Sequence, residues 1–513
     1  MAVFPTSLDI QVQLSGSAGA WTSLAADLRA DTEIKCEYGI HGSRVDDRVA
    51  SIGSLEFALN NSQRNSATTL GYYSPYSDNL RSGFFIGSGA RLTITYSGST
   101  FVKHVGKISS IDPIPGLYRE RATLVTSTDW ISEAATWKIS GLSTMVNARA
   151  DEAAACLIRN IPVPPTASTL ATAGMTLPYL NIAVRDEETT VLQELDRLAR
   201  TEYGYVYVRG NTASGGELVF EDRRARFNAA CPIATISNEM VAMSAPLKRE
   251  NGFSFLRTTV HPRRADDTAN VVIFYIDEPL AIGAGETVNI SCGFRDPNNQ
   301  SQRIGATEVV TPVASTDYLF GTGQWDNTLI GNLSASFVTT SNSVEATIRN
   351  TGSVSGVLSA LQVRGRGLYD YQPVRIEQSG GATALSRFGG QIIDYDMAYL
   401  DNPSTASAIG QYIIDHFANV QHQMVERVGW WANSSSALMV AALQAEPGAR
   451  LALVETVGDI ATTFYIQGVA LTIGKRGQIY CEVDLIQDSE YNLNGNYWVL
   501  GTSTLGTSTR LAL

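Results

Sequence analysis

The tetrapeptide Gly89-Ala90-Arg91-Leu92 near the start of the chain recurs as Gly448-Ala449-Arg450-Leu451 near its end. Each copy opens a strand-like stretch, and each stretch leads through a turn into an aromatic-led strand. That strand closes on Gly106 in the first copy and on Gly468 in the second. The recurrence predicts two similar small β-domains, one at each end of the chain. A shared tetrapeptide can also arise by chance, and the sequence alone leaves that alternative open.

Both copies continue into a further apolar strand, which spans residues 122–125 in the first copy and 479–485 in the second. Two like modules in one chain suit a threefold assembly, because three chains then present six near-equivalent units. We therefore interpret the repeat as a device for assembly.

The composition favours a large, folded, mainly β protein. A length of 513 residues predicts about three or four domains. Apolar residues make up 44% of the chain and aromatic residues 9%, which is enough for packed cores. The 44 glycines against 17 prolines suit many short strands and tight turns. A net charge of −12 repels phosphate backbones, so specific nucleic-acid binding is disfavoured.

Targeting and redox signals are few. Residues 1–5 lack the basic segment and apolar core of a signal peptide, and the longest apolar stretch, around 437–445, is too short to span a membrane. The cysteines are odd in number and far apart, which predicts reduced thiols made in a cytosol and not a disulfide framework. They are Cys36, Cys156, Cys231, Cys292 and Cys481.

Alternation and helical spacing together predict the domain order. Leu55, Phe57 and Leu59 alternate with polar or small residues, as half-buried strands do. Helices are expected from 151 to before Pro162, from Thr189 or Thr190 to Gly204, and over 404–419. The predicted fold is mainly β with a smaller α+β unit. It comprises a first β-barrel-like domain over 1–145, a discontinuous α+β domain over 146–240 and 371–420, an inserted β-sandwich over 241–370, a second β-barrel-like domain over 421–490, and a C-terminal tail or docking peptide over 491–513.

The search for catalytic and metal motifs finds little. Gly474-Lys475-Arg476 lacks the upstream glycine spacing and the hydroxyl of a phosphate loop. No nucleophile elbow, dinucleotide-binding turn or helical zinc motif occurs. None of the histidines has a second histidine three or four residues away, so each is interpreted as an ordinary surface or strand residue. They are His41, His104, His261, His416 and His422. We predict no catalytic residue, no metal site and no cofactor.

Two acidic patterns were weighed against that conclusion. Asp394 and Asp396 lie two apart on a strand-like run, so their carboxylates can share one face as a glycoside hydrolase requires. A solvated edge is the favoured interpretation, because no cluster of sugar-binding aromatic residues accompanies them. Asp296-Pro297-Asn298-Asn299 resembles a turn more than a calcium loop, since the alternating acidic ligands are missing.

The C-terminal run supplies the candidate interface residues. Tyr497 and Trp498 follow a polar turn and precede glycine- and threonine-rich repeats, so they can anchor the tail in a pocket of a neighbouring protein. The alternative is that Trp498 folds back on its own last domain, and the sequence does not decide between the two. The predicted interface set is Tyr497, Trp498, Leu500, Leu505 and Leu511.

Four segments together resemble a known family. They span residues 31–57, 83–108, 190–223 and 497–511, and they cover about half of the chain. In order and spacing they are similar to the tail-tip, or baseplate hub, proteins of tailed bacteriophages, particularly those with long, non-contractile tails. Residues 265–365 depart from that pattern and look like an inserted β-sandwich of unknown role.

The resemblance implies a structural protein of the virion tail tip, synthesised in the host cytoplasm. It implies a homotrimeric ring with two β-barrels per subunit, whose six barrels adapt a hexameric tail tube to a threefold tip. The implied partners are other copies of the chain, the distal tail ring, the tail tube, the tape measure, and tip or fibre proteins. Genome DNA would pass through the lumen during ejection without specific binding, and the acidic composition would suit such a channel.

Other functions stay open at this stage. A distal ring or a receptor-binding tail component would share the same particle, and a contractile injection device without a genome would share the same fold. An enzyme, such as a cell-wall glycan hydrolase built on β-domains, belongs to a different class. The host, the receptor and the role of the 265–365 insertion do not follow from the sequence.

Overall fold

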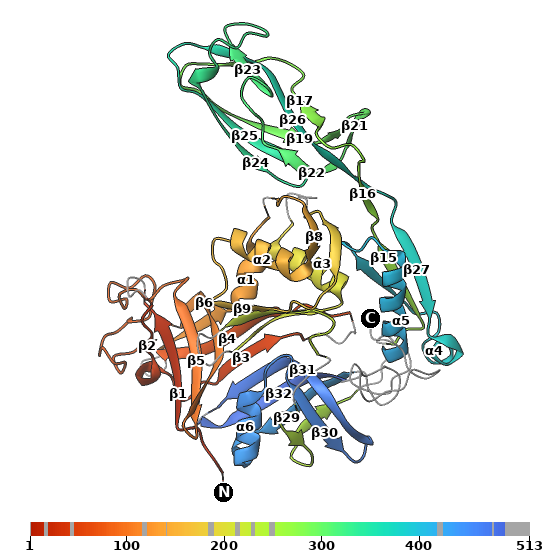
Figure 1. The fold of residues 1–513 in the computed structure, drawn as a ribbon. Helices are drawn as coiled ribbons and strands as arrows, with labels where there is room; N and C mark the ends of the chain where they lie inside the picture. The colour runs from red at the N-terminus through yellow and green to blue at the C-terminus, as the bar shows by residue number, and fades with distance from the viewer. Residues whose placement is uncertain are drawn as a thin grey trace.

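The computed structural model describes residues 2–14, 19–41, 46–114, 121–139, 141–182, 189–210, 216–226, 231–245, 252–417, 424–474 and 477–487, and every structural statement below concerns these residues. Strands make up 47% of the structure and helices 16%, which confirms the mainly β prediction. Figure 1 shows a broad lower body of sheets, a helical region above it, and a β-lobe that projects at the top.

The N-terminal part of the chain forms a sheet with the strand order β3-β4-β7-β6-β5-β1, and β2 (Thr22–Ser23) lies at its edge. We call these six strands the first β-unit. They are β1 (Ser7–Gln13), β3 (Ile34–Gly39), β4 (Ser51–Asn60), β5 (Gly89–Tyr96), β6 (Ser99–Ile114) and β7 (Ala122–Thr128). Their alternating burial, as in β4 where Leu55 and Phe57 point inward, follows from the period of two in the sequence.

A second set of six strands repeats this order. The second β-unit has the strand order β14-β29-β32-β31-β30-β13, so its members take the same places as those of the first unit, in the same chain order. They are β13 (Thr235–Ile236), β14 (Ala242–Ser244), β29 (Met424–Trp431), β30 (Arg450–Glu455), β31 (Ile460–Ile473) and β32 (Ile479–Gln487). One pairing differs in direction, because β1 is antiparallel to β5 whereas β13 is parallel to β30.

The register of the two units shows how the tetrapeptide relates to the repeat. In the first unit the Gly87 N–H donates to the Ile108 carbonyl; in the second the Gly448 N–H donates to the Ile466 carbonyl in the same way, and both glycines have a positive φ. Gly448 is therefore the structural counterpart of Gly87, two residues before Gly89. The units correspond in strand order, but the matching tetrapeptides are displaced by two residues.

The two units are parts of one sheet. β3 of the first unit pairs antiparallel with β31 of the second, from Ile34↔Ile473 to Gly39↔Gly468, and the joined sheet has 13 strands. The closed barrel expected at each end is not found among the described residues, because the strand path runs open from β14 to β2. One apolar core serves both units, and side chains from both, such as Phe57 and Trp430, belong to it. The join turns the two end regions into one body.

An α+β region is built from two stretches of the chain, one between β7 of the first unit and β13 of the second, and one between β14 and β29 of the second unit. Its first part contains α1 (Trp130–Thr136), β8 (Met145–Arg149), α2 (Ala150–Asn160), β9 (Ala167–Leu170), β10 (Thr176–Leu180), α3 (Val191–Glu202), β11 (Tyr205–Arg209) and β12 (Glu217–Glu221). The α3 helix begins after Thr190, whose side chain accepts a hydrogen bond from the Gln193 N–H, and it buries Leu195 and Leu198.

The later part of the chain completes that region. It contains β15 (Phe255–Val260), β27 (Val374–Ser379), α4 (Gly381–Phe388), β28 (Ile392–Met397) and α5 (Pro403–Phe417). β15 pairs with both β27 and β28, and α3 packs against β28. Buried residues of both parts, such as Leu198 and Tyr395, share one core.

The projecting lobe has a core of its own and begins and ends at a narrow neck (Figure 1). It contains β16 (Arg263–Ala265), β17 (Val271–Tyr275), β18 (Leu280–Ile282), β19 (Thr287–Gly293), β20 (Arg295–Asp296), β21 (Asn299–Arg303), β22 (Gly305–Val310), β23 (Tyr318–Gly321), β24 (Leu333–Thr339), β25 (Ser343–Asn350) and β26 (Gly356–Asp370). The sheet around β26 and the sheet β19-β25-β24 both contribute side chains to that core, including Leu358 and Ile348.

Short elements complete the description and bear on the predicted domain boundaries. They are η1 (Ala25–Asp27), η2 (Ile330–Asn332), η3 (Ala432–Ser434) and α6 (Ser436–Gln444). The strand pairing places residues 235–244 with the second β-unit, although the predicted boundaries divided them between the α+β domain and the β-sandwich. The remaining boundaries stay predictions.

Candidate functional site

The junction between the two β-units brings two backbones very close together. Gly39 ends β3 with a φ of +104°, a conformation that favours glycine, and a Cβ there would overlap the carbonyl oxygen of Gln467. The Ile40 N–H donates to the same carbonyl at 2.8 Å and so continues the pairing past the end of β3. The backbones therefore approach too closely at this point for any side chain to lie between them.

A buried lysine fastens the junction from the first unit. Lys103 on β6 is 1% exposed and lies where the β5–β6 register shifts, between the pairings of Leu92 and Thr93. Its Nζ donates to the carbonyls of Leu443 at 3.1 Å and Ala445 at 2.8 Å. It donates a third hydrogen bond, of 2.6 Å, to Glu446 Oε1. An ammonium group has three donors, so these bonds satisfy it completely.

Glu446 extends this contact to the α+β region. Besides Lys103, its Oε1 accepts from the Tyr38 hydroxyl at 3.1 Å, and its Oε2 accepts from the Gly210 N–H at 2.9 Å. Burial, together with the charge of Glu446, raises the pKa of Tyr38 well above its ordinary value, so the phenol stays a donor. One carboxylate, placed between α6 and β30 of the second β-unit, thus binds the first β-unit and the end of β11. Such a satisfied buried pair fixes geometry more than it adds stability.

A second polar contact crosses the junction near the surface. His41 Nδ1 lies 2.8 Å from Asp484 Oδ2 on β32, and its Nε2 lies 3.6 Å from Glu37 on β3. Burial alone would lower the pKa of His41, but the hydrogen bond and charge of Asp484, with the charge of Glu37, raise it above the ordinary value. When it is protonated, the imidazole forms an ion pair with Asp484 across the two units.

Stacked arginine and tyrosine side chains join the α+β region to β31. The Arg48 guanidinium carbon lies 3.6 Å from the ring centroid of Tyr203 and 4.4 Å from that of Tyr205. Arg226 lies on Tyr205 at 3.6 Å and on Tyr465 at 4.8 Å. Cation–π contacts of this kind are strongest where water is excluded, and all five residues are buried. The stack makes the α+β region and the second β-unit one packed structure.

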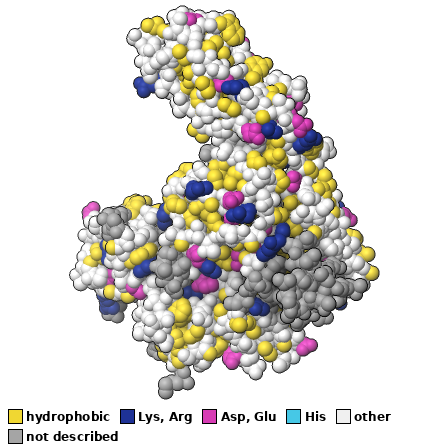
Figure 2. Space-filling view, viewed as in Figure 1, with side chains coloured by type: hydrophobic (Ala, Val, Ile, Leu, Met, Phe, Trp, Pro, Cys, Tyr) yellow, Lys and Arg dark blue, Asp and Glu magenta, His cyan; other side chains and the backbone are white. Residues whose placement is uncertain are grey.

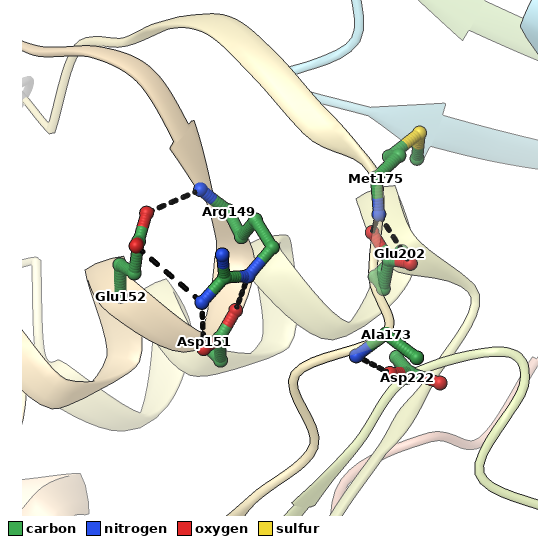
Figure 3. A network of polar contacts seen from close by, with 7 residues as sticks. All are labelled: Arg149, Asp151, Glu152, Ala173, Met175, Glu202 and Asp222. Atoms are coloured by element: carbon green, nitrogen blue, oxygen red, sulfur yellow. Dashed lines mark hydrogen bonds and ion pairs between the residues drawn. The ribbon is translucent and has the colours of Figure 1, made fainter.

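Carboxylates organise the loops of the α+β region itself (Figure 3). Glu202, at the end of α3, accepts from the Met175 N–H at 3.2 Å, and Asp222 accepts from the Ala173 N–H at 2.9 Å. Burial raises the pKa of Glu202 to about 7. Figure 3 also shows Arg149 paired with Asp151 at 2.9 Å and with the neighbouring Glu152 at 3.4 Å, at the start of α2. These carboxylates are engaged by backbone N–H groups and by Arg149, and in that way they hold the loops of the region in place.

The acidic pair proposed from the sequence is found on β28. Asp394 and Asp396 do share one face, and both are exposed. Each has a basic partner: Asp394 lies 3.4 Å from Arg257 on the neighbouring strand β15, and Asp396 lies 2.6 Å from His261, the residue that follows this strand. Both aspartates thus pair with basic side chains across neighbouring segments on an exposed sheet face.

The structure also shows the surroundings of Asp296 and His104, which the sequence analysis considered as candidates. Asp296 lies at the β20–β21 turn and accepts from the Asn298 N–H at 2.9 Å, as the turn interpretation expects. His104 is buried beside Ser127, and burial lowers its pKa to about 3. In the described part of the chain no group of three His, Cys, Asp or Glu side chains gathers as a metal ion would need. Nor does any helix there have the length and apolar character to cross a bilayer.

Some predictions fall outside the described residues. The predicted interface set of Tyr497, Trp498, Leu500, Leu505 and Leu511 lies there, as do Lys475, Arg476 and His422, so these remain predictions. All five cysteines are free thiols; Cys36, Cys292 and Cys481 are buried, Cys156 is half-buried and Cys231 is exposed.

Sequence reasoning missed the residues of the junction. Lys103 is a lone charge in the run Phe101-Val102-Lys103-His104-Val105, and Glu446 stands between an apolar helix and Pro447-Gly448. A charge inside a strand that is otherwise apolar was the available signal, because such a group is buried only with a partner. The partner could not be read from the sequence, since it lies more than 300 residues away.

Comparison with solved structures finds chains that are similar to this one. The 43 kDa tail protein of prophage MuSo2 from Shewanella oneidensis matches with a TM-score of 0.50 and 10% identity, over 94% of this chain and 99% of that one. A tail protein from Neisseria meningitidis MC58 matches with a TM-score of 0.49 and 10% identity, over 94% and 97%. The prophage tail protein gp18 of Listeria monocytogenes matches with a TM-score of 0.35 and 10% identity, over 95% and 96%.

The Shewanella match extends along almost the whole of both chains, so the chain has the fold of a phage tail protein. This confirms, at the level of fold, the resemblance on which the sequence analysis rests. No family model matches the sequence, and no curated protein matches it either.

Proposed function

We propose that the chain is a structural protein of a phage tail and forms the hub of the tail tip as a homotrimer. Three copies would contribute six β-units to one ring and would adapt a sixfold tail tube to a threefold tip. The observation that carries the proposal is the duplication itself: six strands recur in the same chain order and the same sheet order, side by side in one sheet. The fold shared with the Shewanella prophage tail protein supports the same assignment.

The junction supports a role in which shape matters more than chemistry. Its polar groups, Lys103, Glu446 and Tyr38, are paired with one another and with backbone carbonyls. Buried and satisfied polar groups of this kind rigidify a structure. A ring that transmits force between a tail tube and a tip needs its two β-units held at a fixed angle. The junction between the units supplies that rigidity.

The proposal includes partners and a channel. A hub of this kind would contact the distal tail ring, the tail tube, the tape measure, and tip or fibre proteins, and genome DNA would pass through its lumen. The net charge of −12 suits a channel wall on which DNA does not adhere. Placement of the acidic side chains on the outer wall of the assembled ring would remove the basis for the channel proposal.

The projecting lobe favours a second candidate function, receptor binding. It has its own core, and Figure 2 shows it projecting above the rest of the surface. Because Ala265 pairs with Leu368 at the neck, a short turn can replace residues 266–367. If the lobe recognises a cell-surface glycan, the shortened chain should lose binding to host cells while the full chain keeps it. Equal binding by both chains would exclude this role.

The experiment for the leading proposal has two parts. Native mass spectrometry of the purified chain should give a mass of three chains, and antibodies raised against it should label the distal end of tails in electron micrographs. A single-chain mass at all concentrations, with label along the whole tail or on the capsid, would contradict the hub assignment. A cell-wall hydrolase would instead lose activity on glycan after Asp394→Asn or Asp396→Asn.

A further inference from the structure

We propose that Trp325, at the far end of the projecting lobe, is the contact residue of a carbohydrate-binding site that takes an uncharged pyranose ring of a cell-surface glycan. This inference rests on the receptor-binding role proposed for the lobe, and it names the site and the chemistry of the ligand. It does not depend on the number of chains in the ring.

The strand pairing places Trp325 away from the body of the protein. β26 reaches the neck at Asp370 and begins at the opposite end of the lobe, where Val357 pairs with Gly321, the last residue of β23. The segment that follows Gly321, residues 322–329, is called the tip loop below. It lies at the end of the lobe farthest from the neck, near the label β23 in Figure 1.

Trp325 serves neither the core nor the backbone of the lobe. The residue is 70% exposed, and its φ is +64°, which a bulky residue rarely adopts. Glycine takes this conformation more readily. Bulky residues held in such a conformation are typical of sites where the side chain has a function. A role in binding accounts for an exposed indole ring at this position.

The tip loop holds the exposed ring in a fixed position. The Asp326 carboxylate accepts from the Thr322 N–H at 2.7 Å and hydroxyl at 2.8 Å, and from the Thr328 hydroxyl at 2.7 Å and N–H at 3.0 Å. These hydrogen bonds, led by that from the Thr328 hydroxyl, lower the pKa of Asp326 below its ordinary value. The Asn327 amide donates to the Ser315 hydroxyl at 2.8 Å. A loop fixed in this way binds a ligand without a large cost in conformational entropy.

Hydroxyl and amide groups accompany the ring. A second loop, of residues 351–355, lies beside η2, which follows the tip loop, because the Thr351 N–H donates to the Asn332 carbonyl at 2.7 Å. Hydroxyl groups and the side-chain amide of glutamine both donate and accept hydrogen bonds. The exposed polar side chains of the tip loop are Thr322, Gln324 and Thr328, and those of the second loop are Thr351, Ser353 and Ser355.

The composition of the two loops favours an uncharged sugar. Neither loop contains a lysine or arginine, the side chains by which proteins hold phosphates, and Asp326 is their one carboxylate. An indole face packs against the C–H groups of a pyranose ring, while hydroxyls and amides pair with the hydroxyls of the sugar. The core of a protein–protein interface is a wider apolar area, whereas the exposed large apolar side chains of these two loops are Trp325 and Val354.

The test measures binding of the full-length chain to immobilised neutral oligosaccharides of hexoses and N-acetylhexosamines by surface plasmon resonance. At least one of them should bind, and Trp325→Ala should lower the affinity about tenfold, as the loss of one stacked aromatic ring does. Trp325→Tyr keeps an aromatic face and should retain most of the affinity. Sialylated and phosphorylated oligosaccharides form a second arm, since Arg349, shortly before the second loop, is the nearest cation in the sequence.

Two further variants separate binding from structure. Val338→Ala is the matched control and should leave the affinity unchanged, because Val338 is 64% exposed in the same lobe but pairs with Glu345 at the end of β24 opposite to η2. Trp325→Gly should abolish binding without lowering the thermal midpoint of unfolding, because glycine adopts a positive φ without strain. A clear fall in that midpoint would assign Trp325 to the packing of the lobe instead.

The outcomes distinguish this site from the proposed role of the lobe. Equal affinity of Trp325→Ala and the parent, binding to charged oligosaccharides alone, or no binding to any neutral oligosaccharide would each overturn the site. If the full chain then still binds host cells and the chain shortened at 266–367 does not, the receptor-binding role stands without it. Equal binding of both chains to host cells would remove the role and the site together. Loss of affinity in Trp325→Ala, with retention in Trp325→Tyr and Val338→Ala, supports the site.

Discussion

Lys103 is where burial and charge conflict most sharply in this chain. Its ammonium group is fully buried and fully bonded, so loss of one partner leaves the other charge without compensation. Lys103→Met should lower the free energy of unfolding by about 3–5 kcal/mol, because Glu446 then lies at the junction without its cation. Urea unfolding followed by tryptophan fluorescence measures this loss.

The double variant Lys103→Met/Glu446→Gln is the matched control for that substitution. It removes both charges, so it should recover a large part of the lost stability, although the Gly210 N–H keeps only an amide acceptor. If the losses in the free energy of unfolding from the two single substitutions simply add in the double variant, Lys103 and Glu446 are not coupled.

Asp129 makes stability depend on pH. It caps α1 through the Ile131 N–H, and burial raises its pKa from 3.8 to about 7. A folded state that holds the proton more tightly than the unfolded state is favoured below the ordinary pKa, and that contribution is lost as the pH rises through the folded value. The free energy of unfolding should therefore fall between pH 3.8 and about 7 in part because of this group.

Asp129→Asn isolates that contribution, because the amide cannot ionise and its oxygen can still accept from Ile131. The free energy of unfolding of the variant should decline less steeply with pH than that of the parent over the same range. At the acidic end, the stability of the parent should approach that of the variant. Glu202 and His41 act in the same direction and remain in both proteins. Identical pH profiles for the two proteins would show that Asp129 does not hold the proton.

At the scale of elements, the β3–β31 pairing depends on a glycine. Gly39→Ala should destabilise the chain by about 2–4 kcal/mol, because the residue has a positive φ and its Cβ would overlap the Gln467 carbonyl. Gly98→Ala is the matched control: Gly98 also has a positive φ, but no atom lies within 4 Å of the added Cβ, so about 1 kcal/mol is expected. Thermal or urea unfolding of the two variants separates the cost of steric overlap at Gly39 from the cost of backbone strain alone at Gly98.

Individual strands and helices could be predicted from the sequence, because they follow local patterns. The alternation of Leu55, Phe57 and Leu59 matches β4, and the cap at Thr190 with its leucine face matches α3. The tetrapeptide pointed to the repeat in the wrong register, because the β5–β6 hairpin has a tight turn and a bulge, whereas the β30–β31 hairpin has a longer turn and no bulge. β13 and β14 were missed because two- and three-residue strands carry no period.

At the scale of the whole molecule, the pairing of β3 with β31 was out of reach of sequence patterns. Strand pairing over more than 400 residues depends on register and tertiary packing, which no local period encodes. The same holds for the junction, where Lys103 meets Glu446 only after the two units have joined. What the sequence did indicate was two similar end modules, and the described residues of both form a single open sheet.

The symmetry of the purified assembly tests the central claim most directly. Averaged electron-microscope images of the full-length chain, viewed down the ring axis, should show six near-equal lobes that obey threefold symmetry, with alternate lobes differing by the inserted regions. Single particles of one chain, or a ring whose lobe number is not twice its chain number, would contradict the claim that duplicated β-units let three chains imitate sixfold symmetry.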